Sequence, residues 1–578
     1  MVDGKSYGFG EFVAVAALMS VPENSPLRRP EQFDQIGRER PRLDALAKST
    51  GTAEFGIDAE VENLYRAVVV RSPVLGAALK SFDASAALEQ SGVVNVVEIK
   101  SGVAVVAESY WQARKAAAVL ELNWEKSELG LWSSDSIYNK FNETLNDSSQ
   151  KGLECCDEGE GDKLLDQSAT VVAADYYAPY LAHATMEPLN CTVEINGDAC
   201  AIYLGTQNIQ ASAGAAVYYG DFDADKVKVH GAFLGGGFGR RGIGDDVAEA
   251  VLIAQQTGRN IQLVWSREDD MNNDFYRPAA LVRMQAGVSE QGLIETWAVR
   301  RVGPNIMGYM LDEWVDALAP DYLNKGFIDW LSKLGQPIFN RFIADPSAAD
   351  GIYADYDAPN KAVRHVTQDP GLRTGFWRSV GHSSNAFFKE SFIDELAQRA
   401  GIDELQFRLA NMQNNPRLID ATELVAAKAG WGKPLPEGHF HGLATHSSFG
   451  SAVAQIAEVS IKGTQIIVHK VTAAIHCGMV VNPGIVRDQV EGGIIYGLTA
   501  ALHGEITLVD GVIQQSNFHN YPMLRMADAP EVEVHIVESQ EHPQGVGEPG
   551  LPPLAPAVAN AVFKASGQRL RDLPLRLG

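Results

Sequence analysis

The sequence predicts a multidomain α+β protein, and three observations support this fold class. The chain has 578 residues, which at roughly 150 residues per domain suggests about four folding units. Hydrophobic residues make up 46% and charged residues 21%, as in globular proteins with large cores and unlike disordered or collagen-like chains. Short runs rich in β-branched residues alternate with runs of helical periodicity along most of the sequence.

Charge and cysteine content exclude several classes of protein. Forty-eight basic against 73 acidic residues give a net charge of −25, which argues against nucleic acid or an anionic membrane as the chief partner. Five cysteines cannot build a disulfide scaffold, and the absence of CxxC leaves no obvious iron–sulfur or zinc motif. No apolar run reaches 18 residues, so the sequence predicts no membrane-spanning helix.

The first 126 residues are predicted to contain an arm and a small module. Residues 1–36 are expected to form a short helix, over 12–21, and part of a proline-rich connecting arm, because Asp3 and Glu11 give the region before the helix no signal-peptide character. Residues 37–126 are predicted as an α+β module. Its expected elements are strands at 64–70, 93–99 and 103–107 and a helix at 108–120.

The rest of the chain divides into a connection and two larger domains. Residues 127–170 are predicted as an acidic connection, because 142–167 are polar and nearly free of β-branched residues. Strand and helix signals then alternate through two domains, 171–420 and 421–578. The clearest strands are expected at 226–233, 261–265 and 294–302, and the clearest helices at 245–256, 385–399 and 557–565.

The richest candidate loop is Gly235-Gly-Gly-Phe-Gly-Arg-Arg-Gly242, between a β-like run and a helix. Its glycines allow close approach of the backbone to a ligand, and Arg240 and Arg241 are expected to add positive charge. The loop also contains a GxGxxG pattern, with Glu268 after the next strand, where a ribose-binding acid would lie. A nicotinamide- or flavin-dependent dehydrogenase is therefore one alternative, and a plain structural turn is another.

A second loop, Gly545-Val-Gly-Glu548-Pro-Gly, holds a carboxylate just before the helix predicted at 557–565. A general base beside the N–H groups of a helix N-terminus is chemically sensible, and the alternative is a solvated turn glutamate. His476 and Cys477 are predicted to fill space at a strand end. The sequence contains neither GxSxG nor HExxH, which argues against two common hydrolase classes.

Taken together and in this order, these loops resemble those of the molybdopterin-binding large subunits of the xanthine oxidase family. Within that family the likeness is greatest to isoquinoline 1-oxidoreductase beta subunits and membrane-associated bacterial aldehyde dehydrogenases. The shared segments extend over nearly the whole chain: 40–124, 180–190, 206–207, 235–239, 375–378, 476–493, 517–522 and 547–550.

This resemblance implies an α/β hammerhead module over 37–126, followed by molybdopterin-binding domains over 171–420 and 421–578. It implies a molybdenum–pterin cofactor, in bacteria usually the cytosine dinucleotide form, and hydroxylation of an aldehyde or N-heterocycle with oxygen from water. Glu548 would be the catalytic base, and Gln207 would bond an oxygen ligand of molybdenum. The implied cofactor-binding residues are Gly236, Gly237, Phe238, Gly239, Arg378, Gln489 and Gly547.

The resemblance also implies partners. Electrons would leave through [2Fe–2S] clusters on a small iron–sulfur subunit, with a cytochrome c subunit as a further candidate, at the periplasmic side of the inner membrane. Arg240 and Arg241 stand where purine-oxidising relatives have Lys and Glu, so a purine substrate is not expected; aldehydes are favoured over isoquinoline-like rings. Relatives of this permuted kind begin with a targeting signal and a Gly-Gln-Gly loop, and that tripeptide does not occur in this sequence. The chain is therefore expected to be a fragment, to be completed by another polypeptide, or to be a truncated non-catalytic relative.

Overall fold

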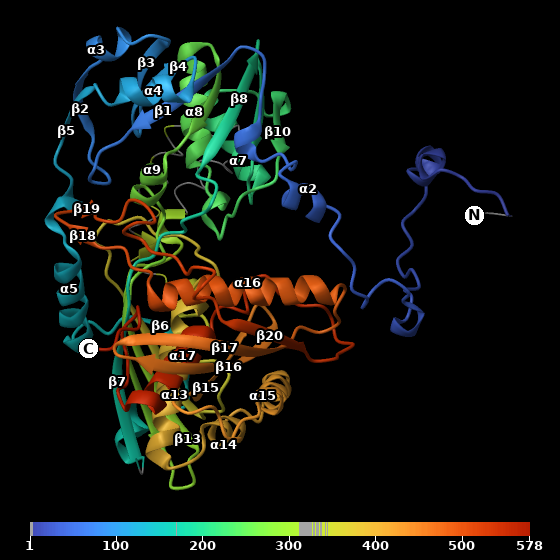
Figure 1. The fold of residues 1–578 in the computed structure, drawn as a ribbon, viewed down its shortest axis with the longest axis vertical. Coiled ribbons are helices and arrows are strands. Elements are labelled where there is room, and N and C mark those ends of the chain that lie inside the picture. Colours follow the sequence, from blue (N-terminus) through green and yellow to red (C-terminus); the bar gives the residue numbers. More distant parts are fainter. Residues whose placement is uncertain are drawn as a thin grey trace.

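The computed structural model describes residues 4–168, 170–310 and 345–578, together with residues 326, 330, 335, 338–340 and 343. Part of the domain predicted over 171–420 therefore lies outside the described residues. Figure 1 shows an upper lobe, a lower lobe and an N-terminal arm that extends away from both. In the described part of the chain, none of the helices combines the length and apolar character needed to span a bilayer.

The upper lobe is built on a seven-stranded sheet. Helices α7 (Ile209–Gly220) and α8 (Asp245–Thr257) cover one face, and α4 (Tyr110–Ala117) covers part of the other. In β1, Ala67 and Val69 face α8 whereas Val68 faces α4, as the two-residue period of a strand requires. The strand order is β10 (Val227–Gly231), β9 (Ala199–Leu204), β8 (Asn190–Asn196), β11 (Asn260–Val264), β1 (Leu64–Val70), β4 (Gly102–Ala107) and β3 (Val93–Ile99).

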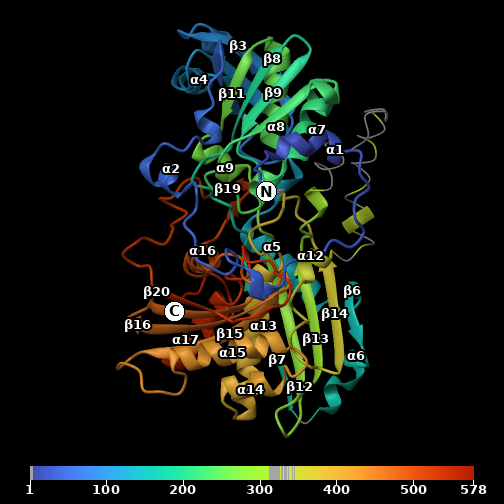
Figure 2. The same ribbon diagram turned by 90° about the vertical axis from the view of Figure 1, so that its right-hand side faces the viewer.

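The lower lobe contains two sheets with helices packed between and against them (Figure 2). The long helix α13 (His382–Ala400) is almost wholly buried, because Phe387, Phe388 and Phe392 place apolar rings on several of its sides. One sheet has the order β6 (Leu153–Glu158), β14 (Asn360–Thr367), β13 (Ile294–Gly303), β12 (Ala280–Val288) and β7 (Thr170–Ala178). The other has the order β15 (Phe440–Ser448), β16 (Ser451–Lys462), β17 (Gln465–His476) and β20 (Glu531–Ile536).

Shorter elements connect and cover these sheets. α16 (Pro483–Leu502) runs along the top of the lower lobe in Figure 1, where it faces the upper lobe. Among the described residues, the other α-helices are α1 (Val13–Ala16), α2 (Ala45–Thr50), α3 (Ser85–Leu88), α5 (Ser134–Asn146), α6 (Gly161–Leu164), α9 (Arg267–Asn272), α12 (Pro346–Ala349), α14 (Glu404–Ala410), α15 (Pro416–Ala429) and α17 (Leu554–Ser566). Two small sheets pair β2 (Leu79–Asp83) with β5 (Glu121–Trp124) and β18 (Leu508–Val509) with β19 (Val512–Ile513).

The strongly periodic predictions are confirmed. The strands expected at 64–70 and 93–99 match β1 and β3, and the helices expected at 245–256, 385–399 and 557–565 match α8, α13 and α17 within a few residues. The three strands of the predicted 37–126 module, however, do not form a sheet of their own. β1 pairs in parallel with β11, so these strands continue the sheet formed by residues 190–264.

Two predictions differ from the structure. The segment 142–167, expected to be an exposed connection, contains the edge strand β6, which pairs with β14 and leaves Cys155 and Cys156 half-buried. An edge strand tolerates polar and charged residues because one of its edges faces solvent, so its sequence lacks the apolar pattern that predicts a strand. The helix expected over 12–21 shrinks to one α-turn, α1, after a 3-10 turn, and its residues are exposed.

Candidate functional site

A pocket with a volume of about 870 Å³ lies where the loops after β9 and β10 meet the segment before α13, the helix α16 and the loop before α17. Because these segments come from both lobes, the pocket exists only when the lobes are docked. It brings together Gln207, Gly237, Phe238, Gly239, Arg378, Gln489, Gly547 and Glu548, eight of the nine residues expected at the site. The ninth, Gly236, lies behind the pocket wall, where its carbonyl accepts a hydrogen bond from Arg241 Nε (2.9 Å).

The glycine loop needs its glycines for conformation and for space. Gly239 has φ +110°, and a Cβ at this position would overlap the carbonyl oxygen of Phe376. A Cβ at Gly237 would overlap Oε1 of Gln207. That oxygen accepts a hydrogen bond from the backbone N–H of Gly239 at 3.1 Å. The loop is therefore packed directly against the Gln207 side chain and the 376–378 segment.

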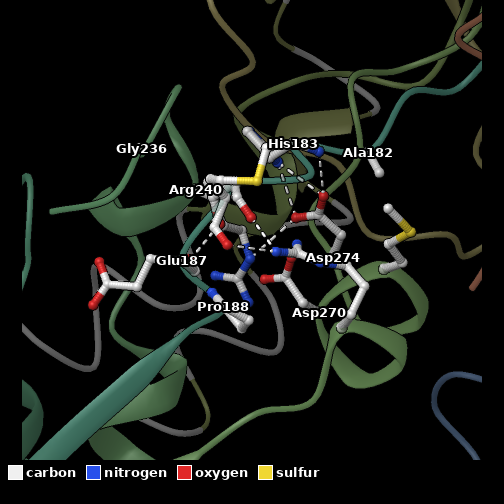
Figure 3. A network of polar contacts seen from close by, with 12 residues as sticks. Ala182, His183, Glu187, Pro188, Gly236, Arg240, Asp270 and Asp274 are labelled. Carbon is white, nitrogen blue, oxygen red and sulfur yellow. Dashed lines mark hydrogen bonds and ion pairs between the residues drawn. The ribbon is translucent and has the colours of Figure 1, made fainter. Parts of the chain in front are cut away.

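The expectation that Arg240 and Arg241 add charge for a ligand is wrong. Both side chains are buried behind the loop, Arg240 against the carboxylates of Asp245 (2.8 Å) and Asp274 (3.0 Å). Arg241 donates to the carbonyls of Gly236 and Glu187 and pairs with the Glu187 carboxylate at 3.2 Å. A buried guanidinium needs such partners, because its desolvation is costly, so Arg240 (Figure 3) and Arg241 both support the loop from its far side.

His183 connects this support to the opposite wall of the pocket. Its Nδ1 lies 2.9 Å from Asp274 Oδ1 (Figure 3), and its Nε2 lies 2.8 Å from the carbonyl oxygen of Phe376. Burial raises the pKa of Asp274, but His183 and Arg240 outweigh burial and leave that pKa below its usual value. Asp274 is thus an anion shared by His183 and Arg240. His183 lies in the 180–190 segment shared with the family, and no local pattern there predicts this role.

Two rings that line the pocket, those of Phe238 and Trp377, stack on the ring of Tyr496. Phe238 stacks on Tyr496 with ring centroids 4.2 Å apart, and Tyr496 stacks on Trp377 at 4.8 Å. The Tyr496 hydroxyl donates to the His183 carbonyl at 2.9 Å, and burial raises the pKa of Tyr496 well above its ordinary value. Tyr496 is therefore a neutral hydrogen-bond donor. Nothing in the sequence around Tyr496 indicated this position, because its partners lie in distant segments.

The loop that carries Glu548 is held by the segment before α13. Arg378 donates from Nε (2.9 Å) and Nη2 (2.5 Å) to the carbonyl of Gly547, and from Nη2 to the carbonyl of Gln489 (3.2 Å). Ser379 donates from its backbone N–H to Glu548 Oε1 and from its hydroxyl to the Glu548 carbonyl, both at 2.8 Å. Burial lowers the pKa of Arg378, and Tyr496 and Glu548 oppose this shift. Two of the Arg378 nitrogens are therefore committed to the protein rather than to a ligand.

The remaining polar candidates lie outside the pocket. Cys477 belongs to the apolar core of the lower lobe, and His476 ends β17 in a buried position, as predicted for residues that fill space. Glu268, weighed as a ribose-binding acid, lies on α9 and accepts a hydrogen bond from Asn517 at 3.1 Å.

The sheet topology argues against the dinucleotide-binding alternative. In such a βαβ unit the strands on either side of the glycine loop and its helix are parallel neighbours. Here β9 and β8 separate β10 from β11.

The donor set indicates how a metal would be held. In the described part of the chain, no group of three or more His, Cys, Asp or Glu side chains is arranged to hold a metal ion. The pocket instead offers glycine backbone, the amides of Gln207, Asn208 and Gln489, the carboxylates of Asp488 and Glu548, and the Arg378 guanidinium. These groups fit an organic cofactor that carries its own metal, because close backbone approach suits a flat, polar ligand.

Comparisons with known proteins agree with this chemistry. Two family profiles, both described as molybdopterin cofactor-binding domain, match residues 145–304 and 389–530. The chain is 30% identical over 562 residues to the beta subunit of isoquinoline 1-oxidoreductase from Brevundimonas diminuta, covering 95% of this chain and 69% of the relative. It is 29% identical over 610 residues to a membrane-bound aldehyde dehydrogenase [pyrroloquinoline-quinone] of Gluconacetobacter polyoxogenes, covering 99% and 76%.

Solved structures share the fold. The aldehyde oxidoreductase from Desulfovibrio gigas superposes with a TM-score of 0.76 at 15% identity, covering 95% of this chain and 80% of that chain. Quinoline 2-oxidoreductase from Pseudomonas putida 86 superposes with a TM-score of 0.75 at 14% identity, covering 94% and 97%.

The fold and the site define a protein that holds a molybdopterin cofactor. The chain belongs to the molybdenum-dependent oxidoreductases of the xanthine oxidase family, as one of their molybdopterin-binding catalytic subunits.

Proposed function

We propose that this protein hydroxylates aldehydes, or a carbon of an N-heterocycle, with oxygen from water, and that Glu548 is the general base. The observation that carries this proposal is the convergence of Glu548, Gln207 and the glycine loop on one pocket. The relatives support the substrate classes, since they are named for isoquinoline, aldehyde and nicotinate oxidation.

Each residue of the pocket would have a distinct role in such a reaction. When bound, the molybdenum cofactor supplies the redox centre and the Lewis acid. Gly237 and Gly239 present backbone without side chains, which allows a ligand to approach closely. Gln207 faces the Gly239 N–H with Oε1, so its NH₂ group is the end left to donate toward an oxygen in the pocket. Glu548 accepts a proton at the carboxylate oxygen that Ser379 does not bind.

The finer identity of cofactor and partners is part of the same proposal. We expect the cytosine dinucleotide form of molybdopterin, a small subunit with [2Fe–2S] clusters as electron acceptor, and a cytochrome c subunit as a further partner. The names of relatives support a multi-subunit enzyme, since the isoquinoline and nicotinate enzymes are both named as single subunits of larger assemblies. The periplasmic side of the inner membrane is the proposed location, and the membrane-bound relative favours it.

The test uses the chain co-produced with a small iron–sulfur subunit of the kind proposed as its partner. Molybdenum per chain is measured by elemental analysis, and turnover is measured with aliphatic and aromatic aldehydes and with isoquinoline, using an artificial electron acceptor. Glu548→Gln should retain molybdenum and lose at least about a hundredfold in kcat, in line with removal of a general base. The exposed Glu538→Gln is the matched control and should leave kcat unchanged.

Two outcomes would contradict the proposal. Equal rates for Glu548→Gln and the parent would remove Glu548 from the role of base. Failure of the co-produced parent to bind molybdenum and to turn over any of these substrates would instead favour a non-catalytic relative.

A further inference from the structure

We propose that Ser379 is a positioning residue that aims the Glu548 carboxylate into the pocket. The inference rests on the proposed role of Glu548 as base. Ser379 contacts Glu548 at both ends of the residue, because its backbone N–H donates to Oε1 and its hydroxyl donates to the main-chain carbonyl, each at 2.8 Å. Two bonds from one residue fix both the position of the Glu548 backbone and the direction of its side chain.

The backbone conformation of Ser379 makes this double contact possible. Ser379 has φ +72° and the next residue, Val380, has φ +49°, so two successive non-glycine residues adopt the left-handed conformation. Such conformations persist only where the surroundings impose them, and they gather at functional sites. A glycine would adopt φ +72° without strain but has no hydroxyl. Serine therefore accepts the strained conformation and adds the second hydrogen bond.

The surroundings that impose this conformation are visible. Ser379 is fully buried, and the Val380 N–H donates to the Trp377 carbonyl at 2.6 Å, which closes a tight turn. At Gly381 a Cβ would overlap the carbonyl oxygen of Ser347, so the chain cannot shift on that side. The helix α13 begins one residue later, at His382. Ser379 is thus held in place between the Arg378 contacts and a buried helix, so it can fix the position of Glu548.

Other side chains hold the rest of the same loop through its carbonyl groups. The hydroxyl of Ser451 donates to the Gly545 carbonyl (2.6 Å), Arg378 donates to that of Gly547, and Gln455 Nε2 donates to that of Gly550 (2.7 Å). These donors fix the main chain on either side of Glu548. Ser379 is distinct from them because it also binds the carboxylate. One carboxylate oxygen is thereby occupied, and the other remains to accept a proton in the pocket.

The test compares Ser379→Ala with Ser383→Ala in the co-produced enzyme. Ser383 is a matched control, because it is buried in the same region and its hydroxyl donates to a main-chain carbonyl, that of Val380, at 2.8 Å. We expect Ser379→Ala to lower kcat by about tenfold, since a misdirected base loses near-attack geometry, with KM and molybdenum content within about twofold of the parent. Amide hydrogen exchange over 545–551 should become faster in Ser379→Ala and not in Ser383→Ala.

Ser379→Gly is the second variant, because glycine fits φ +72° and folds even where alanine does not. It should show the same loss of kcat and the same faster exchange. Unchanged kcat and unchanged exchange in both Ser379 variants would overturn the inference. Failure of the proposed function gives a different pattern, in which Glu548→Gln retains turnover while the exchange over 545–551 still responds to Ser379. Loss of molybdenum in the Ser379 variants, with kcat per bound molybdenum unchanged, would also overturn it.

Discussion

The ring of Phe238 stacks on the ring of Tyr496 with centroids 4.2 Å apart and an interplanar angle of 18°. Phe238 belongs to the glycine loop of the upper lobe and Tyr496 to α16 of the lower lobe. The contact therefore joins the two halves of the pocket, and Trp377 extends the stack toward the Arg378 segment. A ring stack of this kind contributes about 0.5–1.5 kcal/mol beyond the area it buries.

Tyr496→Leu should lower both the molybdenum content and the unfolding midpoint. The substitution removes two ring stacks and the hydrogen bond to the His183 carbonyl, a loss of about 2–4 kcal/mol. Elemental analysis and thermal denaturation measure the two effects. Tyr138→Leu is the matched control, since it breaks the ring contact with Tyr177 outside the pocket and should leave molybdenum content unchanged. Full molybdenum content in Tyr496→Leu would contradict a role for the stack in holding the pocket together.

Gly237→Val should lower molybdenum content. A Cβ at Gly237 overlaps Oε1 of Gln207, so the Gln207 side chain must leave its hydrogen bond to the Gly239 N–H. The variant therefore disturbs the glycine loop around the pocket both through Gln207 and through the bulk of the new side chain. Gly231→Val in β10, where a Cβ meets open space, is the control and should retain the metal. Equal molybdenum content in the two variants would count against a role for the glycine loop in holding the cofactor.

His183→Leu should destabilise the protein by about 1–3 kcal/mol, because it leaves the buried Asp274 carboxylate without one of its hydrogen-bond partners. The Phe376 carbonyl also loses its hydrogen bond. Urea denaturation measures the loss. A double-mutant cycle with Asp274→Leu should show that the two single effects do not add, since both residues belong to one network. Additive effects would show that the His183–Asp274 contact contributes little.

Stability should fall as the pH is lowered from about 6.5 toward 4. Burial, and then Lys389, lowers the pKa of His382 to about 4, and burial lowers the pKa of His446 well below its ordinary value. His382 Nδ1 lies 2.8 Å from His446 Nε2, so the pair is held with at least one neutral ring. In the unfolded chain a histidine has a pKa of about 6.5, so below that pH the unfolded chain binds protons that the folded protein does not. The stability that the neutral pair contributes is therefore full above about pH 6.5 and falls as the pH is lowered below it.

His382→Asn should reduce this acid sensitivity, measured as the slope of the unfolding midpoint against pH between 7 and 5. Each histidine contributes at most about 1.4 kcal/mol per pH unit. The exposed His519→Asn is the control and should keep the parental slope. An unchanged slope in His382→Asn would assign the acid sensitivity to other groups.

Part of the candidate site could be predicted from the sequence. Glu548, Gln207 and the glycines of the 235–242 loop stand in local patterns whose chemistry is recognisable, and the structure brings them into one pocket. The directions of neighbouring side chains could not be predicted. Arg240 and Arg241 look like ligand-binding charges in the sequence, but they point away from the pocket because Asp245, Asp274 and Glu187 pair with them in the interior.

By itself, the sequence determined the local elements and the chemistry-bearing loops, because strand and helix periods and glycine-rich turns depend on neighbouring residues. It predicted β1 and α8 almost residue by residue. Only the tertiary structure decided that β1 joins β11, that β6 is a strand, and that Ser379 and Tyr496 belong to the site. Ser379 meets Glu548 across 169 residues of sequence, and contacts at such separation are set by the packing of whole lobes rather than by any local pattern.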